Sequence, residues 1–275
     1  MRKTLYITDL DGTLLGHDAR LSNYTRDTLN TLINRGMLFS FATARSIISA
    51  SKCVAGLHLQ GPVILGNGTF VSDYPTGQVH QFAGLTEESK TALLTLMERE
   101  QAPVMIFALI DGRERVSWLQ ERENGGIKRY LQDRVGDIRL RPVQTFAELA
   151  EGQVTQITMM DEEAKSRHMQ QLCAEVDGIE SSLMTDTYYP QDWTLMIARA
   201  GVSKATGIAL LRQMLPVENV VAFGDNLNDL PLFQAADESY AVANAAEELK
   251  QYATGVIAAN DEDGVAKWLL AHARF

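Results

Sequence analysis

Three short apolar runs in this 275-residue chain each lead into polar side chains that could together bind a cation and an anion. The runs are residues 5–7, 37–42 and 219–223, and the polar residues after them are Asp9 and Asp11, Thr43, and Asp225, Asn228 and Asp229. Lys204 adds an ammonium at the start of a predicted helix. Oxygen ligands with few carboxylates fit Mg²⁺, and the lack of Cys and His at metal-ligand spacing argues against zinc.

The apolar runs are typical of buried parallel strands, which are hydrophobic on both faces. Gly12 lets the backbone turn away directly after Asp9 and Asp11. In an open α/β sheet the carboxyl ends of the strands meet at one edge, where ligands bind. We therefore expect all four polar clusters to lie together at that edge.

Strand and helix patterns alternate in the first and last thirds of the chain, whereas the middle has helix and hairpin patterns. We predict an α/β protein with a doubly wound, Rossmann-like parallel sheet, interrupted by an inserted α+β cap domain. The predicted core is residues 1–83 and 190–275, with a strand at 193–197 opening its second part, and the cap is residues 84–189. Asn67-Gly68 predicts a tight hairpin turn, with strands at 70–72 and 79–82 beside it.

Composition restricts the classes of partner. Apolar residues make up 45% and charged residues 22% of the chain, as in ordinary globular proteins. The net charge of −10 argues against a nucleic-acid partner, and no apolar run approaches the ~20 residues of a membrane span. Asp9 and Asp11 interrupt any signal-peptide pattern, and Cys53 and Cys173 fit reduced thiols, so we expect a cytoplasmic protein with no membrane partner.

The four clusters, in this order, resemble the motifs of the haloacid dehalogenase superfamily, and the large insert between Thr43 and Lys204 resembles its Cof-like branch. Residues 9–13 (Asp-Leu-Asp-Gly-Thr) match the first motif, Thr43 the second, Lys204 the third and residues 224–229 the fourth. Asn244-Ala245 and residues 260–265 also look like the C-terminal half of that branch. Ala44 stands where the branch often has Gly.

The resemblance implies a Mg²⁺-dependent phosphatase for small soluble phosphate monoesters, such as sugar phosphates or phosphorylated cofactors. Asp9 would be the nucleophile that forms an aspartyl-phosphate, and Asp11 the general acid and base. The metal would be held by Asp9, the backbone carbonyl of Asp11, and Asp225. The phosphate would be bound by Thr43, Ala44, Lys204 and Asn228, with Asp229 beside Lys204 or the metal waters. The cap would close over the site and select the substrate.

Other interpretations remain open at this point. Taken singly, Thr43, Lys204 and Asp225 are more typical of a strand end, a solvated helix face and a turn, and only their joint order favours a site. The same residues could serve a phosphotransferase or phosphomutase, and a catalytically silent metabolite-binding homologue is a third alternative. Arg45 fits either a surface position or the substrate edge.

Overall fold

The computed structural model describes residues 3–185 and 193–275, and its contacts divide the chain into two units. Unit 1 comprises residues 1–82 and 202–275, and unit 2 comprises residues 83–201. The predicted limits of the cap and of the second core segment, at 189 and 190, lie outside the described residues. No helix among the described residues is long and apolar enough to span a membrane.

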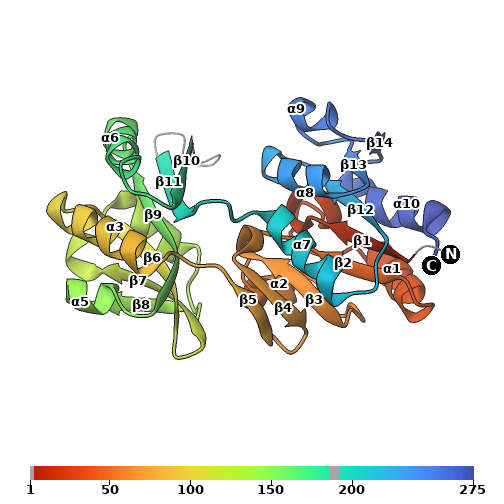
Figure 1. The fold of residues 1–275 in the computed structure, drawn as a ribbon, viewed down its shortest axis with the longest axis horizontal. Helices are drawn as coiled ribbons and strands as arrows, with labels where there is room; N and C mark the ends of the chain where they lie inside the picture. Colours follow the sequence, from red (N-terminus) through yellow and green to blue (C-terminus); the bar gives the residue numbers. More distant parts are fainter. Residues whose placement is uncertain (1–2, 186–192) are drawn as a thin grey trace. The chain divides into compact units, whose positions relative to one another are not determined.

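Unit 1 is built on a five-stranded parallel sheet in the order β14-β13-β12-β1-β2. Its strands are β1 (Thr4–Thr8), β2 (Leu38–Phe41), β12 (Asn219–Gly224), β13 (Glu238–Val242) and β14 (Gly255–Ile257). All five residues of β1 are buried, as expected for a strand covered on both faces. The two chain segments of unit 1, red to orange and cyan to blue in Figure 1, meet where β1 pairs with β12.

Helices and a small antiparallel sheet complete unit 1. The helices are α1 (Asn23–Asn34), α2 (Ile47–Cys53), α7 (Lys204–Met214), α8 (Leu230–Ala235), α9 (Glu247–Lys250) and α10 (Gly264–His272). Helix α1 packs with α10, and α7 packs with α8. The small sheet has the order β3-β4-β5, with β3 (Gly61–Leu65), β4 (Phe70–Tyr74) and β5 (Val79–Phe82). Its β3 joins the main sheet through a parallel bridge between Ile64 and Ala42.

Unit 2 is built on a separate six-stranded sheet in the order β10-β11-β9-β6-β7-β8. Its strands are β6 (Val104–Ile110), β7 (Arg113–Leu119), β8 (Leu140–Val143), β9 (Gln153–Asp161), β10 (Ile179–Thr185) and β11 (Trp193–Arg199). Its helices are α3 (Glu87–Arg99), α4 (Gly125–Gln132), α5 (Phe146–Leu149) and α6 (Glu163–Cys173). Every strand pair is antiparallel except β7 with β8. The predicted fold class, an α/β parallel-sheet core with an α+β insert, is confirmed.

Two local predictions were wrong. The strand predicted at 193–197 to open the second core segment is β11, which pairs with β9 and β10 in unit 2. Only alternate residues of β11, Leu195 and Ile197, are fully buried, as in an antiparallel strand rather than a parallel core strand. The turn at Asn67-Gly68 does join antiparallel strands, and residues 70–72 lie in one of them, β4. The other strand is β3, whereas residues 79–82 form β5 on the far side of β4.

Candidate active site

A buried ammonium lies between two buried carboxylates at the carboxyl edge of the parallel sheet. Lys204 is the first residue of α7, and its Nζ donates to Oδ1 of Asp9 at 2.6 Å and to Oδ1 of Asp229 at 2.5 Å. Asp9 follows β1 and is 5% exposed, while Lys204 and Asp229 are 1% and 0% exposed. Charges this deep are stable only when they are paired and hydrogen-bonded, so each member depends on the others.

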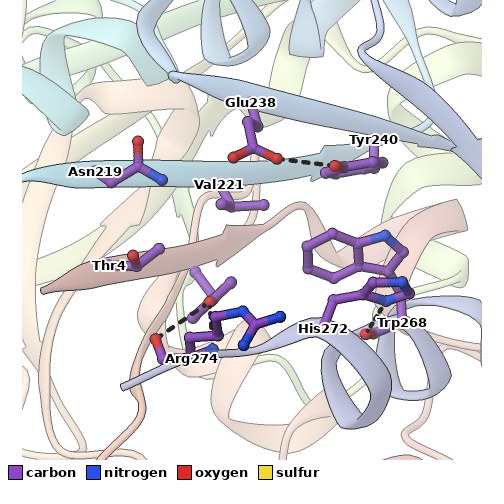
Figure 2. Close-up of a pocket in the computed structure, with 9 residues that line it drawn as sticks. Thr4, Asn219, Val221, Glu238, Tyr240, Trp268, His272 and Arg274 are labelled. Atoms are coloured by element: carbon purple, nitrogen blue, oxygen red, sulfur yellow. Dashed lines mark hydrogen bonds between the residues drawn. The ribbon is translucent and has the colours of Figure 1, made fainter. Parts of the chain in front are cut away.

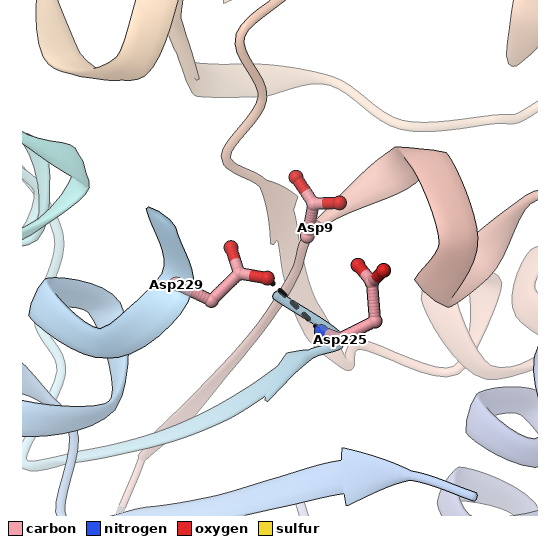
Figure 3. Close-up of side chains that lie close together, drawn as sticks. All are labelled: Asp9, Asp225 and Asp229. Atoms are coloured by element: carbon pink, nitrogen blue, oxygen red, sulfur yellow. Dashed lines mark hydrogen bonds between the residues drawn. The ribbon is translucent and has the colours of Figure 1, made fainter. Parts of the chain in front are cut away.

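Asp225 brings a third carboxylate to the same place. It follows β12, and its Oδ1 accepts a hydrogen bond from Thr13 Oγ1 at 2.8 Å. Asp229 Oδ2 accepts from the backbone N–H groups of Asp225 and Asn226 at 3.0 and 3.2 Å, the first of which Figure 3 shows. Both oxygens of Asp229 are therefore engaged, whereas among the described residues nothing donates to Oδ2 of Asp9 or of Asp225. Asp9 and Asp225 thus each keep a carboxylate oxygen that could bind a cation, whereas the carboxylate of Asp229 contacts Lys204 and the backbone.

The donor set fits a divalent cation. One carboxylate oxygen from each of Asp9, Asp225 and Asp229 lies within 4.8 Å of the others, and within the described part of the chain Lys204 is the only cation that pairs with any of the three. Burial, together with the charges of Asp229 and Asp225, raises the pKa of Asp9 to about 8 although Lys204 opposes the rise. Burial likewise raises the pKa of Asp225 to about 6. A hard cation with oxygen ligands, such as Mg²⁺, would relieve this excess of negative charge.

Lys204 stays charged in this environment. Burial alone would lower the pKa of its ammonium, but the charges and hydrogen bonds of Asp9 and Asp229 raise it above the ordinary value overall. The lysine is therefore a fixed positive charge beside Asp9, suited to holding a carboxylate and a phosphoryl group together.

These shifts predict how stability depends on pH. Between 3.8 and about 8, folded Asp9 binds a proton that the unfolded chain has lost, and Asp225 does so between 3.8 and about 6. The metal-free protein should therefore lose unfolding free energy as the pH rises through this window, because the folded state holds more protons. Urea unfolding of the wild type and of Asp9→Asn would test this prediction. Measurements at about pH 4.5, 6 and 8 would cover the interval in which Asp9 holds its extra proton. The wild type should lose stability relative to the variant as pH rises. A constant difference between the two proteins would contradict the prediction.

Asp11 lies apart from the buried cluster and is bound by an arginine. Its carboxylate is 51% exposed and accepts from Arg45 Nε at 2.6 Å and from Arg45 Nη2 at 2.5 Å. Directly after Asp11 the backbone turns at Gly12, whose φ is +76°, and the Asp225 carboxylate occupies the space that a Cβ would need there. No larger residue fits, so the close approach of Asp225 explains the glycine.

The predicted phosphate-binding residues differ in burial and in their contacts. Thr43 is buried, and its Oγ1 accepts from the backbone N–H of Arg45 at 3.1 Å, which leaves its hydroxyl hydrogen available. Ala44 and Asn228 are exposed, and among the described residues the Asn228 side chain has no hydrogen-bond partner. The structure thus brings Asp9, Asp225, Asp229 and Lys204 into one cluster, while Ala44 and Asn228 lie outside its hydrogen bonds.

Several residues whose contacts the sequence did not predict hold the backbone next to the site. Asn244 Nδ2 donates to the carbonyl of Gly12 at 2.8 Å, and Asn244 Oδ1 accepts from the backbone of Asn260 at 3.0 Å. Asn260 Nδ2 in turn donates to the carbonyl of Leu15 at 2.8 Å. The backbone N–H of Asn67 donates to the carbonyl of Thr43 at 2.9 Å. No regular spacing in the sequence links Asn67, Asn244 and Asn260. The resemblance to the family includes Asn244 and Asn260, but it predicted no contact for either.

A hollow in unit 1 lies at the end of the strands opposite to the carboxylate cluster. It encloses about 500 Å³ and is lined by Thr4, Tyr6, Asn219, Val221, Glu238, Tyr240, Trp268, His272 and Arg274. Figure 2 shows these side chains on β1, β12, β13, α10 and the C-terminal residues. Thr4, Asn219 and Glu238 are the first residues of their strands, whereas Asp9 and Asp225 follow strand ends. This hollow is therefore separate from the carboxylate cluster.

Comparison with known proteins finds a matching family, similar proteins and a similar fold. The model of a family described as haloacid dehalogenase-like hydrolase matches residues 6–269. A Bacillus subtilis 5-amino-6-(5-phospho-D-ribitylamino)uracil phosphatase is 25% identical, covering 96% of each chain. The Escherichia coli pyridoxal phosphate phosphatase is 26% identical, also covering 96% of each chain. The fold is similar to the crystal structure of a Thermotoga maritima protein, with a TM-score of 0.80, 24% identity and coverage of 100% of this chain and 99% of that chain.

Proposed function

We propose that this chain, which belongs to the haloacid dehalogenase-like hydrolase family, is a phosphatase that uses Mg²⁺ and an aspartyl-phosphate intermediate to hydrolyse small phosphate monoesters. The observation that carries the proposal is the contact of Lys204 Nζ with Asp9 beside Asp225. Asp9, Lys204 and Asp225 would supply a nucleophile, a fixed positive charge and a cation-binding carboxylate at one edge of the sheet. Phosphoryl transfer needs these elements because its catalysis rests on positioning and charge stabilisation.

In the first step, a carboxylate oxygen of Asp9 attacks phosphorus while the bond from phosphorus to the leaving alcohol breaks. Asp11 donates its proton to the oxygen that leaves phosphorus, so that the leaving group departs as a neutral alcohol. In the second step, water attacks the same phosphorus, the bond from Asp9 to phosphorus breaks, and Asp11 takes the proton of the water. Asp9 is thereby regenerated as a carboxylate and inorganic phosphate is released.

The remaining residues bind and orient. Mg²⁺, held by Asp9, the backbone carbonyl of Asp11, and Asp225, would neutralise charge on the phosphoryl oxygens. Lys204 places its ammonium beside Asp9, and Asp229 holds that ammonium through the 2.5 Å contact. The Thr43 hydroxyl, the backbone of Ala44 and the Asn228 amide are proposed to bind the phosphoryl group.

The proposed substrates are small phosphate esters of the sugar-phosphate or phosphorylated-cofactor class. The two curated relatives described above are named for substrates of this kind, a phosphorylated ribitylaminouracil and pyridoxal phosphate. The cytoplasm is the proposed location. A transferase would need an acceptor alcohol, so release of inorganic phosphate in water alone separates a phosphatase from a phosphotransferase.

Removal of the metal should abolish most of this activity. Purified protein should release phosphate from a chromogenic aryl phosphate in Mg²⁺, and chelation should lower kcat at least about 100-fold, because three carboxylates then surround one ammonium. Added Mg²⁺ should restore the rate. Circular dichroism with and without chelator controls for unfolding. Undiminished turnover in excess chelator would contradict the metal requirement.

A further inference from the structure

Arg45 binds both carboxylate oxygens of Asp11, the residue proposed as proton donor to the leaving group. The two contacts, 2.6 Å from Nε and 2.5 Å from Nη2, form a bidentate fork in which each nitrogen uses a different oxygen. Such planar pairs are among the strongest and most directional charge-assisted hydrogen bonds. Asp11 therefore has no free oxygen in this arrangement with which to donate a proton.

The arginine itself is held firmly. Its Nη1 donates to Ser49 Oγ at 2.8 Å, on the first turns of α2. Its backbone N–H donates to Thr43 Oγ1 at 3.1 Å, and its carbonyl accepts from the backbone of Gly66 at 3.1 Å. The side chain is 24% exposed, which is enough for a bound anion to reach the guanidinium. Arg45 is thus anchored next to Thr43, where the phosphoryl group is proposed to bind.

Two anions can therefore compete for one guanidinium. The fork of an arginine matches a phosphate as well as it matches a carboxylate, and a phosphate ester carries more negative charge. For Asp11 to protonate a leaving group, at least one of its two bonds to Arg45 must break. A substrate phosphate beside Thr43 supplies the group that can replace them.

We propose that Arg45 is a latch: it holds Asp11 in a non-donating orientation in the empty site and transfers to the anionic group of the substrate when that group binds. Release of Asp11 then coincides with substrate binding, so the acid is set free only when there is a leaving group to protonate. Arg45 is in this sense both a substrate-binding residue and a positioning residue for Asp11. This inference rests on the proposed phosphatase function.

Phosphate binding tests the latch without requiring turnover. Isothermal titration calorimetry in Mg²⁺ would measure the Kd of inorganic phosphate for the wild type, Arg45→Ala, Asp11→Asn and the double variant. Arg45→Ala should weaken binding about tenfold. Asp11→Asn alone should tighten phosphate binding about fivefold, since Arg45 is then no longer bound by a carboxylate. The same change should tighten binding much less when it is combined with Arg45→Ala. Equal tightening by Asp11→Asn in both backgrounds would overturn the proposal, because the effect would then be general charge removal.

A matched control and a second readout separate the latch from a structural role. Arg212 pairs with Asp237 at 2.6 Å elsewhere in unit 1, and Arg212→Ala should leave the phosphate Kd unchanged. Arg45→Lys, which keeps the charge but not the fork, should bind phosphate with intermediate affinity. In turnover, Arg45→Ala should raise KM for alkyl and aryl phosphates alike and keep the ratio of their kcat values, because Asp11 remains able to act.

A selective loss of kcat for the alkyl ester would instead overturn the latch, since it would mean that Asp11 needs Arg45 in order to donate. A wild type that binds phosphate with this coupling but turns over neither ester would refute the proposed function and leave the latch intact. The experiments therefore distinguish failure of the latch from failure of the proposed phosphatase function.

Discussion

Replacement of Asp9 by Asn should lower kcat on a chromogenic phosphate ester at least about 10⁴-fold, because an amide oxygen cannot serve as the nucleophile. Asn is nearly the same size as Asp, so the change tests the chemistry more than the packing. The variant also leaves Lys204 paired with Asp229, which preserves one of the two buried ion pairs. Steady-state kinetics in saturating Mg²⁺ would measure the loss.

Two controls make the Asp9→Asn result interpretable. Asp237→Asn changes a carboxylate of unit 1 that pairs with Arg212 outside the site, and its kcat should remain within about twofold of the wild type. Mass spectrometry should exclude deamidation of the new Asn, which would regenerate Asp9. More than about 1% of wild-type kcat in a preparation free of deamidation would contradict the role of Asp9.

Replacement of Lys204 by Met should damage activity and stability together. Lys204 is 1% exposed and its ammonium contacts Asp9 and Asp229, so its removal leaves two buried carboxylates without a cation. Breaking a buried pair in this way costs about 3–5 kcal/mol of unfolding free energy, and loss of the fixed charge should lower kcat about 10³-fold. Urea unfolding in chelator and steady-state kinetics in Mg²⁺ would measure the two effects.

The control for Lys204→Met is Lys250→Met. Lys250 pairs with Glu247 at 2.7 Å, but Glu247 is 84% exposed, so loss of this surface pair should cost no more than about 1 kcal/mol. The stability loss of Lys204→Met should also shrink as the pH falls below about 8, because Asp9 then takes up a proton. Equal stability losses for the two lysine variants would contradict the description of Lys204 as the charge on which the cluster depends.

The buried cluster could be predicted from the sequence because it follows from topology. The strands β1 and β12 are short apolar runs, and parallel pairing places the residues after them, Asp9 and Asp225, at the same edge. Lys204 was harder to predict, since a lysine at a helix start is ordinarily solvated. Its burial depends on two carboxylates that are 195 and 25 residues away in sequence.

The features that were missed depend on long-range pairing that no local pattern encodes. The pattern of residues 193–197 fits a strand in the sheet of unit 1 or in that of unit 2. Only the pairing with β9 and β10 places this strand in unit 2. The fork between Arg45 and Asp11 joins the loops that follow β2 and β1, and neither loop specifies its side-chain orientation in sequence. The link from Asn244 to Gly12 spans 232 residues and has no periodic signal.

Trapping of the covalent intermediate tests the role of Asp9 most directly. The wild type would be quenched during turnover of a phosphate ester, treated with borohydride to reduce any acyl phosphate to an alcohol, digested and sequenced by mass spectrometry. Attack by Asp9 predicts homoserine at position 9, absent when substrate is omitted. Homoserine or another reduced carboxylate elsewhere in the chain, with Asp9 intact while a pre-steady-state burst shows that an intermediate accumulates, would contradict it.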